Sequence, residues 1–218
     1  LLATGVSDWT TVTDEQFAAA AAWLREAHAN VRVYWSDPAE LAALMTAEMG
    51  KLLVDGHTEI ELCAAILDYT AEHGPKALAD EERTYGAEDK RGIVSYQPLG
   101  VIYSIQPWNF PFYQPVRVLA TSLMAGNGCI LKHASICTGS ALRLRELCID
   151  AGLPENLFQV LVIDHETSDK LIEHPKVRGV TLTGSDKAGS HVGALASKAL
   201  KKTVNEHGSN DAILVYED

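Results

Sequence analysis

The sequence is poor in basic residues and lacks any long apolar run, and each shortage excludes a class of protein. Its 218 residues include 18 Lys and Arg against 29 Asp and Glu, which gives a formal net charge of −11. A general nucleic-acid-binding protein carries a basic surface instead. No apolar run approaches the roughly 18 residues of a membrane span, and the first residues, LLATGVSDW, lack the basic and apolar parts of a signal peptide. We expect neither nucleic acid nor a membrane as a partner.

Cysteine is also scarce, and its spacing carries no metal signature. Cys63, Cys129, Cys137 and Cys148 form no CxxC pair, and the eight histidines form no HExxH. This pattern favours free, buried thiols in a reducing compartment, the cytoplasm, and predicts no metal site. The remaining composition, 47% hydrophobic and 22% charged, is that of an ordinary globular protein with one sizeable core.

The hydrophobic pattern changes near Arg91. Before it, amphipathic helices are predicted at residues 13–27, at 38–50 and from an N-cap at Thr58 onwards. After it, short apolar strands are separated by helices, which is typical of a parallel sheet covered on both faces. The predicted fold class is therefore α/β: a doubly wound, mostly parallel sheet preceded by N-terminal helices.

The pattern also places the individual elements. The predicted strands lie at residues 99–105, 129–131, 158–163, 177–182, 202–205 and 212–215, and the predicted helices between them at 113–124, 138–151, 167–173 and 187–200. Residues 83–97, polar and then alternating, are predicted to be a strand excursion in another layer. A doubly wound sheet binds its ligand beyond the carboxyl ends of its strands, so candidate site residues should stand there.

Two of these strand ends suit an anion, although neither GxGxxG nor a P-loop is present. Thr183-Gly184-Ser185, between a strand and a helix, offers backbone N–H groups and a hydroxyl to a phosphate. The same residues also suit a plain helix N-cap. Lys132 is a point charge that can meet a ribose hydroxyl or a phosphate, or else an ordinary solvated lysine.

Two other strand ends suit acid–base and oxyanion chemistry. In Pro107-Trp108-Asn109-Phe110-Pro111, two prolines and two aromatics hold one carboxamide, which can donate to a developing oxyanion. The alternative is a rigid turn packed on the core. Glu206 can act as a general base if it is partly desolvated, or it is an exposed loop glutamate.

Taken together, these strings resemble the aldehyde dehydrogenase superfamily. The matching motifs, in order, are Glu48-Met49-Gly50-Lys51, Pro98-Leu99-Gly100-Val101, Pro107-Trp108-Asn109-Phe110-Pro111, Ala125-Gly126-Asn127 with Leu131-Lys132, Ala151-Gly152-Leu153-Pro154, Leu182-Thr183-Gly184-Ser185, and Glu206 with Gly208. Their order and spacing hold from about Pro38 to Asp218. Within the family, Lys132-His133-Ala134-Ser135 and residues 152–185 look most like the succinate-semialdehyde dehydrogenase group.

The resemblance implies a nicotinamide cofactor, a small aldehyde substrate and, for the full-length family, a homo-oligomer. In the implied site Ile105 and Trp108 line the cofactor cleft, and Gly184 and Ser185 lie near the pyrophosphate. Lys132 and Ser135 hold the adenosine ribose. Many relatives have a glutamate where Ser135 stands. The absence of this glutamate removes a negative charge that would repel a 2′-phosphate, so NADP is favoured over NAD.

The implied chemistry is covalent: a cysteine attacks the aldehyde, Asn109 helps to hold the oxyanion and Glu206 is the base that activates water. The nucleophile is missing, because the family places it a few tens of residues after Glu206 and the sequence continues for twelve. Polar Asn205 and His207 flank Glu206 where relatives are apolar. Asp164-His165-Glu166 replaces a glycine-containing turn.

These departures set the expected domains and function. Residues 1–207 are expected to form an NAD(P)-binding domain, with the excursion at 83–97 belonging to an oligomerisation or bridging layer, and residues 208–218 to begin a truncated catalytic domain. We expect an aldehyde dehydrogenase fragment that is inactive alone. The alternative is a non-catalytic nucleotide-binding or structural remnant that associates with intact relatives. A hydrolase or kinase is disfavoured, because neither a GxSxG elbow nor a P-loop occurs.

Overall fold

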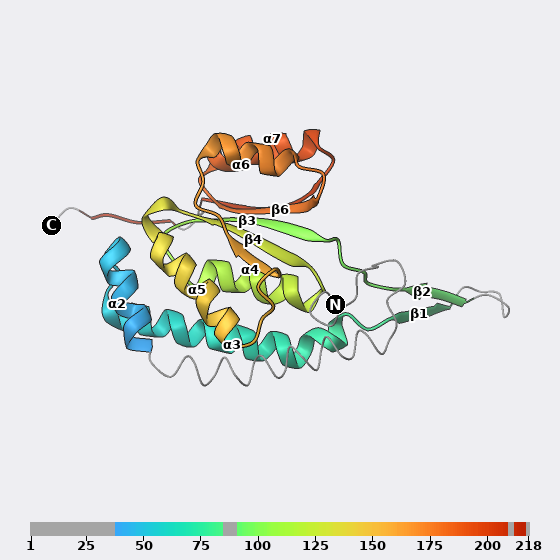
Figure 1. The fold of residues 1–218 in the computed structure, drawn as a ribbon, viewed down its shortest axis with the longest axis horizontal. Coiled ribbons are helices and arrows are strands. Elements are labelled where there is room, and N and C mark those ends of the chain that lie inside the picture. Colours follow the sequence, from blue (N-terminus) through green and yellow to red (C-terminus); the bar gives the residue numbers. More distant parts are fainter. Residues whose placement is uncertain (1–37, 85–90, 209–211, 217–218) are drawn as a thin grey trace.

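The computed structural model describes residues 38–84, 91–208 and 212–216 (Figure 1). Its central layer is a five-stranded sheet in the order β5-β4-β3-β6-β7, and every neighbouring pair is parallel. The strands are β3 (Val101–Gln106), β4 (Gly128–His133), β5 (Phe158–Val160), β6 (Val177–Gly184) and β7 (Lys202–His207). The doubly wound α/β prediction is therefore confirmed.

Helices cover both faces of this sheet (Figure 1). On one face lie α2 (Pro38–Met49), α3 (Leu53–Ala77), α4 (Tyr113–Met124) and α5 (Thr138–Asp150), with the 3₁₀ turn η2 (Ser135–Cys137) before α5. On the other lie α6 (His165–Glu173) and α7 (Asp186–Lys198). No helix among the described residues is long and apolar enough to cross a membrane.

Each face of the sheet has its own core, because successive strand residues point to opposite sides. Cys129 and Leu131 of β4 pack with Phe112 and the helices α2–α5. Ile130, the residue between them, packs with Tyr103 and the α6–α7 layer. The alternation of strand residues thus decides which side chains meet which helices.

The strand order changes direction between β3 and β6. The chain moves outward from β3 through β4 to β5, and from β6 to β7 on the other side. The carboxyl ends of β3 and β6 consequently form the switch point at which doubly wound sheets bind ligands. The predicted site residues stand at this edge.

Residues 83–97 contribute to a separate sheet, as expected. β1 (Glu81–Thr84) and β2 (Arg91–Val94) pair antiparallel and extend away from the main body (Figure 1). The two ends of this register are Glu81 opposite Val94 and Thr84 opposite Arg91.

Several predicted boundaries are wrong. The third helix begins at Leu53 rather than at Thr58, whose hydroxyl donates to the Val54 carbonyl within the helix. β5 ends at Val160, and residues 212–216 form no strand. Their apolar pattern requires a neighbouring strand, and the described chain offers none beside them. The helix expected at 13–27 and the segment before Pro38 lie outside the described residues.

Candidate functional site at the carboxyl edge of the sheet

Register brings the predicted cofactor residues of β3 and β4 together. Ile105 lies opposite Lys132 on one side and Leu182 of β6 on the other. Ile105 packs with the α6–α7 core, as does Ile130. Lys132, two residues after Ile130, stands on that same face. Ile105 and Lys132, two of the residues expected to touch the cofactor, thus share the α6–α7 side of the edge.

Lys132 is buried and has no partner among the described residues. Its residue surface is 7% exposed, so the expectation of a solvated lysine is wrong. Burial lowers the pKa of its ammonium group. A buried cation without a hydrogen bond is unfavourable, which makes Lys132 a ready donor for an oxygen-rich ligand.

Ser135 lies in a shallow pocket at the carboxyl ends of β4 and β5. The pocket is lined by His133, Ser135, Thr138, Ala141 and residues 160–163. The backbone carbonyl of Ser135 accepts a hydrogen bond from the Thr138 hydroxyl (2.9 Å), while the residue remains exposed. Lys132, three positions before Ser135, is not among the residues that line this pocket.

Three of the helix N-termini at this edge are closed by carboxylates of the chain itself. Glu59 accepts hydrogen bonds from the first N–H groups of α4, and Glu48 does the same for α5. Asp164 caps α6 through the N–H of Thr167. These contacts occupy the positions at which a helix would otherwise bind a phosphate.

The N-terminus of α7 is capped by a neutral hydroxyl instead. Ser185 Oγ accepts a hydrogen bond from the Ala188 N–H (3.3 Å), which confirms the N-cap interpretation. A Cβ placed on Gly184 would meet only the Leu182 side chain, at 3.7 Å. Space is therefore open above Gly184, and a role in pyrophosphate binding stays a prediction.

The loop of residues 107–111 is held by its backbone, as the rigid-turn interpretation expects. His133 Nε2 donates to the Pro111 carbonyl (2.9 Å), since His133 Nδ1 accepts from the Ala134 N–H. Cys137 Sγ contacts the Trp108 carbonyl at 3.7 Å. Burial lowers the pKa of His133, which keeps the ring in this neutral, donating form.

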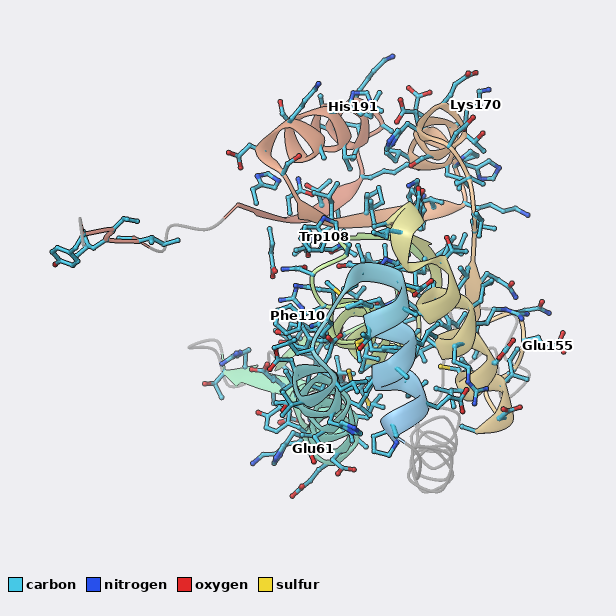
Figure 2. The ribbon with its side chains drawn as sticks, turned by 90° about the vertical axis from the view of Figure 1, so that its left-hand side faces the viewer. Glu61, Trp108, Phe110, Glu155, Lys170 and His191 are labelled. Carbon is cyan, nitrogen blue, oxygen red and sulfur yellow. The ribbon has the colours of Figure 1, made fainter. Side chains whose placement is uncertain are left out.

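The Asn109 side chain is exposed and makes no hydrogen bond with a described residue, so its amide is available to a ligand. Its neighbour Trp108 is 55% exposed. In Figure 2, Trp108 lies at the level of the sheet, and Phe110 lies between the sheet and α3. The turn therefore combines a fixed backbone with side chains that face outward.

Glu206 is exposed, as the alternative of an exposed glutamate expects, and it is paired with a cation. Arg117 donates from both terminal nitrogens, Nη1 to Oε1 (2.9 Å) and Nη2 to Oε2 (2.6 Å). The hydrogen bond from Arg117 lowers the pKa of Glu206. Glu206 stands in β7 rather than in a loop.

Sequence reasoning missed Arg117. It is the one charged residue in α4, YQPVRVLATSLM, and a lone cation in an apolar helix is the signal that could have found it. Its side chain also contacts the Gln114 oxygen (3.0 Å) and the Thr183 hydroxyl (3.4 Å). Arg117 therefore lies between α4, β6 and β7.

No cysteine of the chain is activated as a nucleophile. All four are free, and burial raises the pKa of Cys63 well above its usual value, that of Cys137 to about 11 and those of Cys129 and Cys148 to about 12. A thiol reacts as its thiolate. The described residues also contain no group of three or more His, Cys, Asp or Glu that could hold a metal ion.

Comparisons with known proteins agree with the resemblance that the sequence motifs carry. The model of the "Aldehyde dehydrogenase family" matches residues 9–218. The succinate-semialdehyde dehydrogenase [NADP(+)] of Deinococcus radiodurans is 44% identical over 178 residues, which cover 82% of this chain and 37% of that protein. Its counterpart from Mycobacterium avium is 41% identical over 200 residues, covering 91% of this chain and 42% of that protein.

Solved structures agree. The crystal structure of succinic semialdehyde dehydrogenase from Streptococcus pyogenes in complex with NADP+ is 31% identical, with a TM-score of 0.84, and the match covers 98% of this chain and 50% of that one. The chain spans about two fifths of the length of the curated relatives that it matches.

Proposed function

The chain belongs to the aldehyde dehydrogenase family, and we propose that it is the cofactor-binding portion of an NADP-dependent enzyme that oxidises a succinate-semialdehyde-like aldehyde to a carboxylic acid. Residues 1–207 form the cofactor domain in this proposal, and residues 208–218 begin the catalytic domain. The observation that carries the proposal is the burial of Lys132 at the carboxyl end of β4, beside β3, without a partner among the described residues. The four thiols of the chain are not activated as nucleophiles, so we expect the isolated chain to bind cofactor without oxidising an aldehyde.

The residues at the edge fit a dinucleotide with a 2′-phosphate. The Lys132 ammonium would hold the adenosine ribose and its phosphate, with Ser135 beside it. Ser135 brings no negative charge, so it does not repel a phosphate as a carboxylate would. Gly184 and Ser185 would take the pyrophosphate at the N-terminus of α7, which is capped by a neutral hydroxyl rather than a carboxylate, and Ile105 and Trp108 would line the cleft. NADP, once bound, supplies a hydride acceptor.

The opposite face of the edge supplies the polar groups for the aldehyde. The Asn109 amide N–H would donate to the oxyanion that forms when the carbonyl carbon is attacked. None of the four cysteines is assigned as the nucleophile for that step. Glu206 would accept a proton from the attacking water, and the ion pair with Arg117 must open before its oxygens can do so.

Arg117 supports a substrate that carries a second carboxylate. Its planar fork suits bidentate carboxylate binding, and its Nε has no hydrogen-bond partner among the described residues. The distal carboxylate of succinate semialdehyde would replace Glu206 on Arg117. Substrate binding would thereby release the base next to the reacting carbonyl.

A second candidate function is a non-catalytic module that associates with intact relatives. The observation that favours it is the exposure of Ile213, Leu214 and Val215, which are 86%, 78% and 89% exposed. An apolar extended segment of this kind pairs readily with another chain. Sedimentation as a single monomeric species would contradict this second function.

The cofactor proposal is tested by calorimetric titration of the chain with NADPH. Saturable binding by the wild type, weakened at least about tenfold, or about 1.4 kcal/mol, in Lys132→Met, would support it. Lys170→Met is the matched control, because Lys170 is a solvent-exposed lysine of α6 paired only with Glu166. No binding by a folded wild-type chain, or equal loss in both variants, would overturn the proposal.

A further inference from the structure

Glu59 of α3 is a carboxylate whose side chain has no access to solvent. The side chain is 0% exposed, and its Oε2 pairs with the Lys51 ammonium at 2.5 Å. Its Oε1 accepts hydrogen bonds from the backbone N–H groups of Phe112 (2.7 Å) and Tyr113 (2.9 Å). A buried charge is strongly unfavourable unless it is paired and hydrogen-bonded, and Glu59 meets both conditions.

The groups that Glu59 and Lys51 contact lie on the two sides of Pro111. The Lys51 ammonium stands 3.9 Å from the centroid of the Phe110 ring, before the proline, and Glu59 binds the backbone after it. Because Phe112 occupies the N-cap position, α4 has no side-chain cap of its own. The pair therefore fixes the chain just after Asn109, from the side of α2 and α3.

Asn109 depends on this support. Its side chain makes no hydrogen bond with a described residue, so the position of its amide is set by the backbone beneath it. An oxyanion donor is effective only when it is held close to its productive geometry, within about 0.5 Å. On the β4 side, His133 and Cys137 contact the backbone of this turn, and within α4 the Gln114 N–H donates to the Phe110 carbonyl (3.2 Å).

We propose that Glu59 and Lys51 are positioning residues for the Asn109 amide. This inference rests on the proposed function, in which that amide meets the oxyanion. Glu59 clamps the start of α4, Lys51 neutralises Glu59 and covers the Phe110 ring, and together they hold the turn that presents Asn109. Neither residue touches the substrate.

Glu48 offers a matched control. It too is a carboxylate of an N-terminal helix that closes the N-terminus of a later helix, through the N–H groups of Gly139 (2.5 Å) and Ser140 (2.9 Å). It also accepts from the Ser140 hydroxyl (2.6 Å). These contacts are to α5, and none is to residues 107–111.

The test is an NMR experiment on the full chain with ¹⁵N-labelled asparagine, in which loss of a signal in Asn109→Ser assigns the Asn109 side chain. The variants are Glu59→Gln, Lys51→Met and the conservative Lys51→Arg, with Glu48→Gln as the control. Thermal unfolding followed by circular dichroism identifies the variants that fold. We expect Glu59→Gln and Lys51→Met to shift and broaden the Asn109 side-chain signal, whereas Lys51→Arg and Glu48→Gln leave it in place.

An Asn109 signal that is unmoved in folded Glu59→Gln and Lys51→Met, or that moves equally in Glu48→Gln, overturns the inference. If Glu59→Gln does not fold, Lys51→Met decides, because the Lys51 side chain keeps 8% of its surface exposed whereas that of Glu59 keeps none. The readout needs no cofactor, so NADPH titration of the same samples separates the two proposals. If the wild-type chain does not bind NADPH, the proposed function is contradicted. The NMR result still decides whether Glu59 and Lys51 position the turn.

Discussion

Arg117 of α4 and Glu206 of β7, residues 89 positions apart in the sequence, form a bidentate ion pair at the carboxyl edge of the sheet. The pair lies on the α4 side of the sheet, whereas Lys132 lies on the α6–α7 side. The sheet thus separates Lys132, a candidate cofactor residue, from Glu206, the candidate base. The ion pair also sets the state of the candidate base.

Replacing Arg117 with Met is expected to raise the pKa of Glu206 toward the ordinary glutamate value, because the hydrogen bond and charge of Arg117 are what lower it. The measurement is carboxyl ¹³C NMR against pH, with the Glu206 signal assigned from Glu206→Gln. Lys170→Met, which removes the surface partner of Glu166, serves as the control and should leave Glu206 unchanged. An equal Glu206 pKa in wild type and Arg117→Met would contradict the pairing.

His133 is expected to make the chain more stable at pH 7.5 than at pH 5. Burial lowers its pKa in the folded state, so the unfolded chain binds protons more readily. The stability due to His133 is complete above the unfolded value of about 6.5 and is lost as pH falls through the lower folded value. Denaturant unfolding at both pH values should show a smaller difference for His133→Gln, and an equal difference in both proteins would refute the assignment.

The thiols are expected to be unreactive in the native chain at pH 7.5. Burial raises the pKa of every cysteine, that of Cys137 to about 11. A colorimetric disulfide reagent should therefore titrate almost no thiol before denaturation and all four afterwards. Rapid reaction of a single native thiol would identify a prepared nucleophile that the structure does not show.

Gly56→Ala is expected to destabilise the chain at the contact between α3 and α2. A Cβ at Gly56 would lie 2.8 Å from the Ala42 Cβ and 2.9 Å from its Cα, and overpacking of this kind costs about 1–3 kcal/mol. Gly193→Ala is the control, since its Cβ would meet only Asn205, at 3.3 Å. Both glycines are helical, so the gain in helix propensity is shared. Equal free energies of unfolding for the two variants would contradict the close contact.

The fold could be predicted from the sequence because its signals are local. Short apolar segments between helical patterns placed β3, β4, β6 and β7, and the motifs marked Asn109, Lys132 and Ser185. The prediction of a strand at residues 212–215 was wrong, because a strand needs a neighbouring strand to pair with as well as an apolar sequence pattern. The predicted start of α3 was too late. Threonine is a common N-cap residue, but the Thr58 hydroxyl donates to a carbonyl inside the helix.

The details of the site could not be predicted, because they depend on contacts between distant segments. Glu59 meets Phe112 across 53 positions, and nothing near either residue in the sequence signals the pairing. The burial of Lys132 and the exposure of Glu206 depend likewise on which helices cover each face. Local patterns locate such residues at the edge, and tertiary packing decides the direction in which their pKa values shift.

The most direct test of the cofactor assignment is the ratio of NADH to NADPH dissociation constants, measured by calorimetry for the wild type and for Ser135→Glu. The wild type should prefer NADPH, and a glutamate at position 135 should reverse or abolish that preference by repelling the 2′-phosphate, a change of at least about tenfold, or about 1.4 kcal/mol. Ser197→Glu, which adds the same charge near the far end of α7, should leave the ratio unchanged. Equal affinities for both cofactors in the wild type, or a ratio that Ser135→Glu does not alter, would contradict the placement of the adenosine ribose at Lys132 and Ser135.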